Sequence, residues 1–170
     1  MSPAMHFSLE PATADDVATL AGLHTAVADH LNNTYGRGPW SCRTSEKGVL
    51  NAMRISRVLV AREGTEIVAT LRLTPKKPWS IDVSYFTSCR KPLYLLGMAV
   101  APVKQRRGIG KRVLKAAQQI AEAWPADAIR LDAYDAEAGA GRFYARCGYS
   151  EVARVSYRNT PLIYYELLLA

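Results

Sequence analysis

The sequence predicts an α+β or mixed α/β fold, and two observations favour this class. Segments with the alternation typical of half-buried strands are interspersed with segments whose apolar residues recur at helical spacing. Two strongly apolar strands, 93–100 and 128–133, are separated by a helical segment and are expected to pair in parallel, whereas the other strands are joined as hairpins. With 170 residues, the chain is predicted to form one domain over 1–170, with a core over about 8–169.

Two helices are predicted first. Apolar residues recur at helical spacing over 14–32, and Thr13 followed by Asp16 resembles a capping box at the start of that segment. Ser45 is expected to cap a shorter second helix that runs through Met53.

Extended structure follows these helices. Segments 57–62 and 66–73 flank Glu63-Gly64-Thr65 and predict a β-hairpin. Segment 75–92 has a proline at each end and no clear period. It is expected to be either an irregular insertion or a short helix near a functional site.

The strands that should pair in parallel come next. Segment 93–100 predicts a buried strand, and Gly97 within it indicates a bulge or a close approach of backbone. After a basic loop, an apolar stripe predicts a helix over 108–123 that stops before Pro125. Strand 128–133 then completes the unit.

The last predicted elements are a helix and a hairpin. The helix is expected over 137–147, with Gly148 as a left-handed cap just beyond it. Strands 150–157 and 162–169 are expected to be joined through residues 158–161.

Composition excludes several classes of protein. The hydrophobic fraction of 49% and the charged fraction of 22% are those of an ordinary soluble protein. No apolar run approaches the ~20 residues that a bilayer span needs. The N-terminus lacks a secretory signal, and the three cysteines are too far apart for a disulfide framework or a zinc site. We therefore expect a cytoplasmic, reduced protein without a metal.

The net charge of +7 favours an anionic partner, such as nucleic acid, a membrane surface or a phosphorylated small molecule. A merely soluble cationic surface is the alternative. The charge is densest around the sequence Gly-Ile-Gly, where six cations occur with no acidic residue among them. They are Lys104, Arg106, Arg107, Lys111, Arg112 and Lys115.

The glycines explain how this segment would bind an anion. Gly108 and Gly110 let the backbone turn sharply between a strand and a helix. The first N–H groups of the helix have no partner within it, and the helix dipole and the nearby cations reinforce them as an anion site. The segment lacks the Gly-Lys-Ser/Thr of a P-loop and the Gly-x-Gly-x-x-Gly of a dinucleotide-binding fold.

The segment resembles the pyrophosphate-binding motif of the GCN5-related N-acetyltransferases, the GNAT superfamily, whose pattern is Val-x-Pro-x-x-(Arg/Gln)-x-x-Gly-x-Gly/Ala. The resemblance extends to Phe-Tyr-Ala-Arg-Cys-Gly-Tyr at 143–149 and to the order of elements over 8–169. It implies a GNAT-like acyl-CoA N-acyltransferase fold. That fold has a twisted, mostly antiparallel sheet of about six or seven strands with one splayed parallel pair, and about four helices on both faces. The residues that match the motif are Val100, Pro102, Gln105, Gly108 and Gly110.

The resemblance implies acetyl-CoA as donor, a primary amine as acceptor and direct acetyl transfer. The loop would hold the pyrophosphate by backbone N–H groups while four of its cations screen the charge, namely Arg106, Arg107, Lys111 and Arg112. The free edge of strand 93–100 would pair with the pantetheine arm, and an N–H group there would stabilise the thioester oxyanion by about 3–4 kcal/mol. The expected cofactor-binding residues are Met98, Ala99, Val100, Gln105, Arg106, Arg107, Gly108, Ile109, Gly110 and Lys111.

Tyr144 carries over from the family as the general acid that protonates the CoA thiolate. Its ordinary pKa of about 10 keeps it protonated at neutral pH. The alternative is a core residue, because Ala140, Phe143 and Cys147 share helical spacing with it. The resemblance favours catalysis.

The acceptor amine must lose a proton before it attacks, which needs a base or a water chain. Each candidate base could instead be a solvated or capping residue. The candidates are Asp82, Asp132, Asp135 and Glu137.

The expected acceptor site draws on two segments. Asp132 and Tyr134 come at the C-terminal end of a strand, where sites tend to lie. The stretch WSIDVSYF is expected to line the acceptor pocket with Trp79, Tyr85 and Phe86. The family commonly has Asn seven residues before its Tyr, and the glutamate found there would offer charge to a cationic acceptor. The acceptor-binding residues are therefore expected to be Asp82, Tyr85, Asp132, Tyr134 and Glu137.

Two other functions stay open. A nucleic-acid-binding module would use the cations of 104–115 on phosphate, but it needs interleaved aromatic or base-reading side chains, which this segment lacks. A GNAT fold that senses acyl-CoA without turnover is the second alternative, against which Tyr144 argues. The expected partners are acetyl-CoA and an amine, with no nucleic acid and no membrane, and a homodimer is a possible assembly. The sequence assigns no chemistry to Cys147 or to His24, which is expected to be partly buried.

Overall fold

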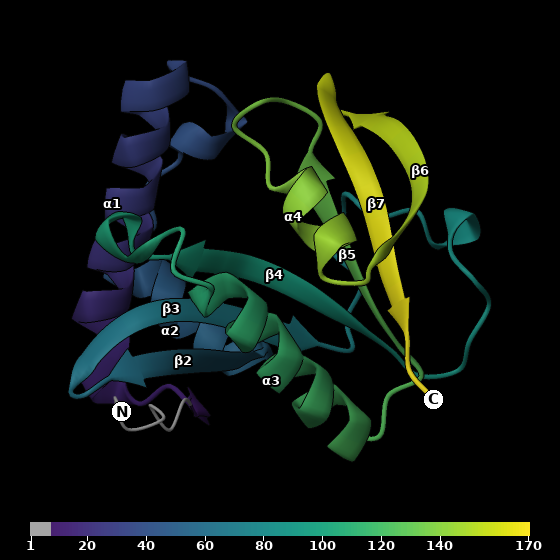
Figure 1. The fold of residues 1–170 in the computed structure, drawn as a ribbon, viewed down its shortest axis with the longest axis horizontal. Coiled ribbons are helices and arrows are strands. Elements are labelled where there is room, and N and C mark those ends of the chain that lie inside the picture. Colours follow the sequence, from purple (N-terminus) through teal and green to yellow (C-terminus); the bar gives the residue numbers. More distant parts are fainter. Residues whose placement is uncertain (1–7) are drawn as a thin grey trace. The chain divides into compact units, whose positions relative to one another are not determined.

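The structure is a computed structural model that describes residues 8–170 (Figure 1). Within this range, seven strands form one mixed sheet in the order β1-β2-β3-β4-β5-β7-β6, which confirms the predicted fold class. The strands are β1 Leu9–Pro11, β2 Arg57–Glu63, β3 Glu66–Thr74, β4 Pro92–Val100, β5 Ala128–Tyr134, β6 Ser150–Tyr157 and β7 Thr160–Leu168. The α-helices of this part of the chain are α1 Val17–Tyr35, α2 Glu46–Ile55, α3 Ile109–Ala123 and α4 Gly141–Arg146.

The chain divides into two compact units. Unit 1 comprises the residues up to Leu73 together with Gly97–Ala117, and unit 2 comprises Thr74–Leu96 together with Gln118–Ala170. The boundaries therefore fall at the end of strand β3, inside strand β4 and inside helix α3. The single-domain organisation expected from the sequence stays a prediction.

The predicted hairpin is present in unit 1, where β2 pairs with β3 in antiparallel register. Helix α2 lies behind these two strands in Figure 1. Apolar residues of helices α1 and α2 pack against strands β2, β3 and β4 to form one core cluster, which removes a large apolar area from water. The cluster contains Val17, Leu20, Leu23, Val49, Val60, Ile67 and Ala99.

The predicted capping box is present, but it begins a 3-10 turn, Ala14–Asp16, and helix α1 follows from Val17 instead of starting at 14. The Thr13 N–H donates to Asp16 Oδ2 at 2.9 Å, and Arg62 Nη2 donates to both oxygens of the same carboxylate at 2.8 and 2.9 Å. Burial by itself would raise the pKa of Asp16, but these partners together hold it below its ordinary value. The helix continues to Tyr35 instead of ending at 32, and Gly36 then reverses the chain with φ +80°.

Helix α2 also begins as predicted. Ser45 Oγ accepts a hydrogen bond from the Gly48 N–H at 3.1 Å. The helix ends at Ile55, slightly beyond the predicted Met53.

Unit 2 contains the predicted parallel pair. Residues Pro92–Tyr94 of β4 pair with Ala128–Arg130 of β5, and β5 pairs antiparallel with β7. Strands β6 and β7 form the last hairpin. Its turn is shorter than predicted, because Arg158 and Asn159 alone connect the strands, both with positive φ.

Helix α4 is shorter than the predicted helix over 137–147. Residues 135–140 form turns, because the chain folds back on the end of β5: a Cβ on Gly139 would lie 1.9 Å from the Tyr134 carbonyl oxygen. Helix α4 therefore begins at Gly141. Gly148 follows it with φ +93°, as predicted.

Segment 75–92 is irregular apart from a single 3-10 turn at Val83–Tyr85. Buried polar side chains of the sheet hold it in place. Arg130 Nη2 donates to the Thr87 carbonyl at 2.7 Å, and Glu166 accepts from the Thr87 N–H at 3.1 Å. The Tyr164 hydroxyl donates to the Ser80 carbonyl.

None of the helices within 8–170 is long and apolar enough to cross a membrane.

Candidate functional site

The basic loop of unit 1 has the backbone geometry of an anion site. Gly108 has φ +77°, a left-handed conformation that glycine adopts without strain. The Arg112 N–H donates to the Gly108 carbonyl at 3.2 Å, so the amides of Ile109, Gly110 and Lys111 precede the first complete turn of α3. Amides in these positions have no acceptor within their helix and lie at the positive end of the helix dipole, so they can bind an anion.

Two side chains of the loop have partners within unit 1. Lys104 Nζ lies 3.5 Å from a Glu63 oxygen and 3.9 Å from a Glu66 oxygen, so the β2–β3 hairpin neutralises this cation. Gln105 Nε2 donates to the Val100 carbonyl at 3.1 Å and braces the loop against the end of β4. Gln105 can therefore contribute to an anion site through its position in the backbone more than through its amide.

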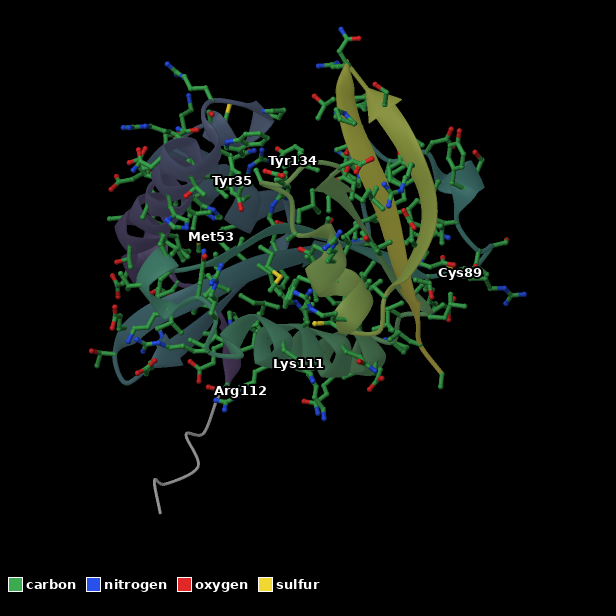
Figure 2. All side chains as sticks on the ribbon, turned by 45° about the horizontal axis from the view of Figure 1, so that its top comes forward. Tyr35, Met53, Cys89, Lys111, Arg112 and Tyr134 are labelled. Carbon is green, nitrogen blue, oxygen red and sulfur yellow. The ribbon has the colours of Figure 1, made fainter. Side chains whose placement is uncertain are left out.

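The other five cations of the segment remain uncompensated. Four lie around the turn, Arg106, Arg107, Lys111 and Arg112, and Lys115 lies further along α3; all are exposed, and none of them forms an ion pair with any residue from 8 to 170. Figure 2 shows Lys111 and Arg112 on the outer side of helix α3. The helix amides therefore provide backbone donors, and these exposed side chains provide positive charge around the same short turn.

Strand β4 leads into this loop and departs from regular geometry at Gly97. Its φ of +60° confirms the predicted irregularity. Met98 and Val100 are half-buried, whereas the side chain of Ala99 is buried in the core cluster. Ala99 can therefore serve a ligand only through its backbone.

Tyr144 is buried in unit 2. Its ring packs against Tyr149 and Tyr165 with centroids 5.8 and 5.9 Å away. Burial raises the pKa of Tyr144 far above its ordinary value, and the charge of Asp132 raises it further, so the hydroxyl stays protonated at neutral pH. The ring is a core residue, and its hydroxyl also meets the requirement of a proton donor.

The candidate bases differ in their surroundings. Asp132 is half-buried and accepts a hydrogen bond from the Ser80 hydroxyl; burial raises its pKa more than this bond lowers it. Asp135 faces Arg154 at 3.3 Å, so its charge is compensated. Glu137 is exposed in the turn before α4 and does not lie on a helix as predicted. Tyr134 is half-buried at the end of β5.

A cavity of about 480 Å³ lies between segment 77–85 and the end of β6. Asp82 and Tyr85 line it, as does the exposed Trp79. Asp82 accepts from the Ser84 N–H and hydroxyl at 3.0 and 2.7 Å, which lowers its pKa and makes it a weak base. Phe86 was expected to line the pocket but is buried.

The burial of Phe86 has a clear cause. Its ring stacks on Tyr164 with a centroid distance of 5.2 Å, and the Arg130 guanidinium lies 5.1 Å from its centre. Phe86 therefore anchors the segment to the sheet.

Within residues 8–170, no three histidine, cysteine or acidic side chains gather as a metal site would require.

Comparison with known proteins identifies the family. The family model for the acetyltransferase (GNAT) family matches residues 25–149, a range that includes Gly97, the basic loop and Tyr144. The chain belongs to the GNAT family. The resemblance inferred from the two motifs is thereby confirmed.

Individual relatives of this GNAT protein are distant. GCN5-related N-acetyltransferase 10, chloroplastic, from Arabidopsis thaliana is 28% identical over 88 residues, which are 52% of this chain and only 34% of that relative. This chain therefore matches about a third of the length of that curated relative.

Solved structures share the fold at low identity. An N-acetyltransferase from Staphylococcus aureus has a TM-score of 0.68 at 15% identity, covering 97% of this chain and 99% of that one. A ribosomal-protein-alanine N-acetyltransferase from Brucella melitensis has a TM-score of 0.71 at 19% identity, covering 95% and 99%. The yncA protein from Salmonella typhimurium, solved with its cofactor acetyl-CoA, has a TM-score of 0.69 at 16% identity, covering 96% and 94%. These likenesses show the fold.

Proposed function

We propose that this GNAT protein transfers the acetyl group of acetyl-CoA directly to a primary amine. One observation carries the proposal: the turn from β4 into α3 combines a left-handed Gly108, the free amides of a 15-residue helix and four uncompensated cations. This combination suits a diphosphate, because the amides give directed hydrogen bonds and the cations offset two negative charges.

The chain would position the donor as follows. The amides near Gly108 bind the pyrophosphate, and the backbone of β4 around Gly97 and Met98 binds the pantetheine arm. Acetyl-CoA supplies an acetyl group activated as a thioester. A backbone N–H near Gly97 would stabilise the negative charge that develops on the thioester oxygen, an effect worth about 3–4 kcal/mol at comparable sites.

Transfer then requires two proton movements. A neutral amine attacks the thioester carbon, a carbon–nitrogen bond forms and the carbon–sulfur bond breaks. Tyr144 donates its proton to the departing thiolate and regains one from the amine nitrogen, directly or through water. Burial keeps the Tyr144 hydroxyl protonated before transfer, and because its raised pKa makes it a weaker acid than an ordinary tyrosine, it gives up the proton only as negative charge develops on the sulfur.

The cations are expected to act mainly through screened electrostatics. The double variant Lys111→Gln, Arg112→Gln should weaken coenzyme A binding about tenfold at low salt, and the loss should shrink as salt shortens the range of the interaction. The measurement is calorimetric affinity at 0.02 and 0.5 M NaCl.

Lys104→Gln provides the matched control. Lys104 is a cation of the same loop, but Glu63 and Glu66 neutralise it, so its variant should bind coenzyme A nearly normally. If Lys104→Gln weakened binding as much as the double variant, the distinction between paired and free cations would be wrong.

Two inexpensive assays test the proposed function. Coenzyme A and acetyl-CoA should raise the melting temperature, whereas single-stranded DNA should have little effect at 0.15 M salt. A panel of primary amines should then reveal thiol release from acetyl-CoA. Stabilisation without turnover on any amine would favour the sensor, and the absence of any shift with coenzyme A would refute both.

A further inference from the structure

The space in front of Gly97 in unit 1 is bordered by two basic side chains. A methyl group placed on Gly97 would lie 3.8 Å from Arg72 Nε and 4.0 Å from His24 Cε1. These groups come from β3 and α1, and Gly97 itself is exposed, so the space is open to solvent. It adjoins the part of β4 along which the thioester is proposed to lie.

His24 is a neutral base without a partner. No residue from 8 to 170 forms a hydrogen bond with its ring. Burial lowers the pKa of His24, and the charge of Arg72 lowers it further; no other charged group of the neighbouring elements contributes. At neutral pH, one ring nitrogen therefore carries a free lone pair.

Arg72 is a half-buried cation without a counter-ion. Its only hydrogen bond within the described chain is from Nη1 to Ser56 Oγ at 3.4 Å, and no carboxylate pairs with it. Burying a guanidinium without a carboxylate is unfavourable, since the charge loses hydration and gains no partner. Its planar fork of donors matches a carboxylate in bidentate geometry.

We propose that the acceptor is a free amino acid, whose carboxylate pairs with Arg72 while His24 takes the proton of its ammonium group. The Arg72 and His24 side chains lie about equally far from the position of a methyl group on Gly97. A ligand that contacts both therefore needs only a few bonds between its carboxylate and its amine, as in an amino acid. The inference rests on the proposed function, since the amine must meet a thioester at Gly97. It supplies the base that the sequence left open among several acids.

The charges of the site then form one cycle. His24 resists protonation while the Arg72 charge is uncompensated. A bound carboxylate neutralises Arg72, so His24 becomes able to accept the first ammonium proton. The neutral amine then attacks the thioester. Its nitrogen loses a second proton, which replaces the proton that Tyr144 gave to the thiolate, and His24 releases the first proton to water.

Paired substrates test this inference with the full-length chain. Each of several amino acids is compared with its decarboxylated counterpart, for example L-phenylalanine with phenethylamine and L-lysine with cadaverine, by thiol release from acetyl-CoA. At least one amino acid should exceed its counterpart in kcat/KM by about tenfold or more, the scale of one charge-assisted contact. Turnover confined to amines without a carboxylate would overturn the inference and leave the proposed function intact.

Two variants separate the roles. Arg72→Gln should raise KM for the amino acid about tenfold or more and abolish the preference for the amino acid over its decarboxylated counterpart. His24→Gln should lower kcat at neutral pH about 10²-fold, remove the acid limb of the pH profile and recover at high pH, where amines deprotonate unaided. Normal coenzyme A affinity in both variants shows that they fold. An unchanged substrate preference in Arg72→Gln contradicts the inference.

A measurement on the wild-type chain covers the case in which a variant does not fold. The chain has three histidines, so the Cε1 proton resonance of His24 can be assigned by replacing His6 and His30. With coenzyme A bound, L-phenylalanine should raise the titration midpoint of His24, and phenethylamine should not. An equal response to both overturns the inference, whereas failure to bind coenzyme A overturns the proposed function.

Discussion

Replacing Tyr144 with phenylalanine is expected to lower kcat by about 10²–10⁴-fold and to change coenzyme A affinity by less than about threefold. The phenyl ring keeps its packing against Tyr149 and Tyr165, so only the hydroxyl is lost. Without that proton donor, the CoA thiolate must leave as an anion or be protonated by water. Steady-state thiol release and calorimetric titration measure the two quantities.

Tyr149→Phe is the matched control. Tyr149 lies beside Tyr144, and its buried hydroxyl has no hydrogen-bond partner among residues 8–170. Removing it should leave kcat within about twofold and leave stability unchanged or raise it by up to about 1 kcal/mol, because no bond is lost and a desolvated hydroxyl is removed. Equal losses of activity in the two variants, or a wild-type rate in Tyr144→Phe from pH 6 to 9, would contradict the proton-donor role.

Gly108→Val should reduce coenzyme A affinity about 10²-fold or more and leave a folded protein. At φ +77° an L side chain strains the backbone by about 1–2 kcal/mol, more for a β-branched residue, so the loop is expected to relax and rotate the amides before α3. The fold should persist, because a Cβ at this position meets no other atom within 4 Å. Circular dichroism and calorimetry give the two readouts.

Gly64→Val separates backbone strain from ligand binding. Gly64, in the turn between β2 and β3, also has a positive φ, +62°, and open space around its Cα. Its variant should lose a similar amount of stability and keep its affinity for coenzyme A. The loop assignment fails if Gly108→Val still binds coenzyme A, or if both variants lose binding equally.

The sequence predicted the elements that depend on local patterns. The Ser45 cap and the hairpin around Gly64 followed from spacing within a few residues, and the parallel pair followed from the helical segment between two apolar strands. Helix α4 was predicted too long, because the turn at 135–140 depends on the fit of Gly139 against the Tyr134 carbonyl, a contact that no helical period reveals. The irregular segment 75–92 has no period, since buried groups of distant strands hold it.

The candidate site divides in the same way. The glycine loop was predictable because glycine adopts a left-handed conformation before a helix without the strain that a side chain brings. The pairing of Lys104 with Glu63 was not, since 41 positions separate them. The same holds for His24, Arg72 and Gly97, which become neighbours only through the fold. Only the structure shows that His24 offers a hydrogen-bond acceptor and Arg72 an unpaired cation beside Gly97.

A crystal structure with coenzyme A bound tests the central claim most directly. We predict that pyrophosphate oxygens lie about 3 Å from the backbone nitrogens between Gly108 and Lys111, with the pantetheine arm along Gly97–Val100. Coenzyme A bound elsewhere on the chain, with the start of helix α3 empty, would contradict the account.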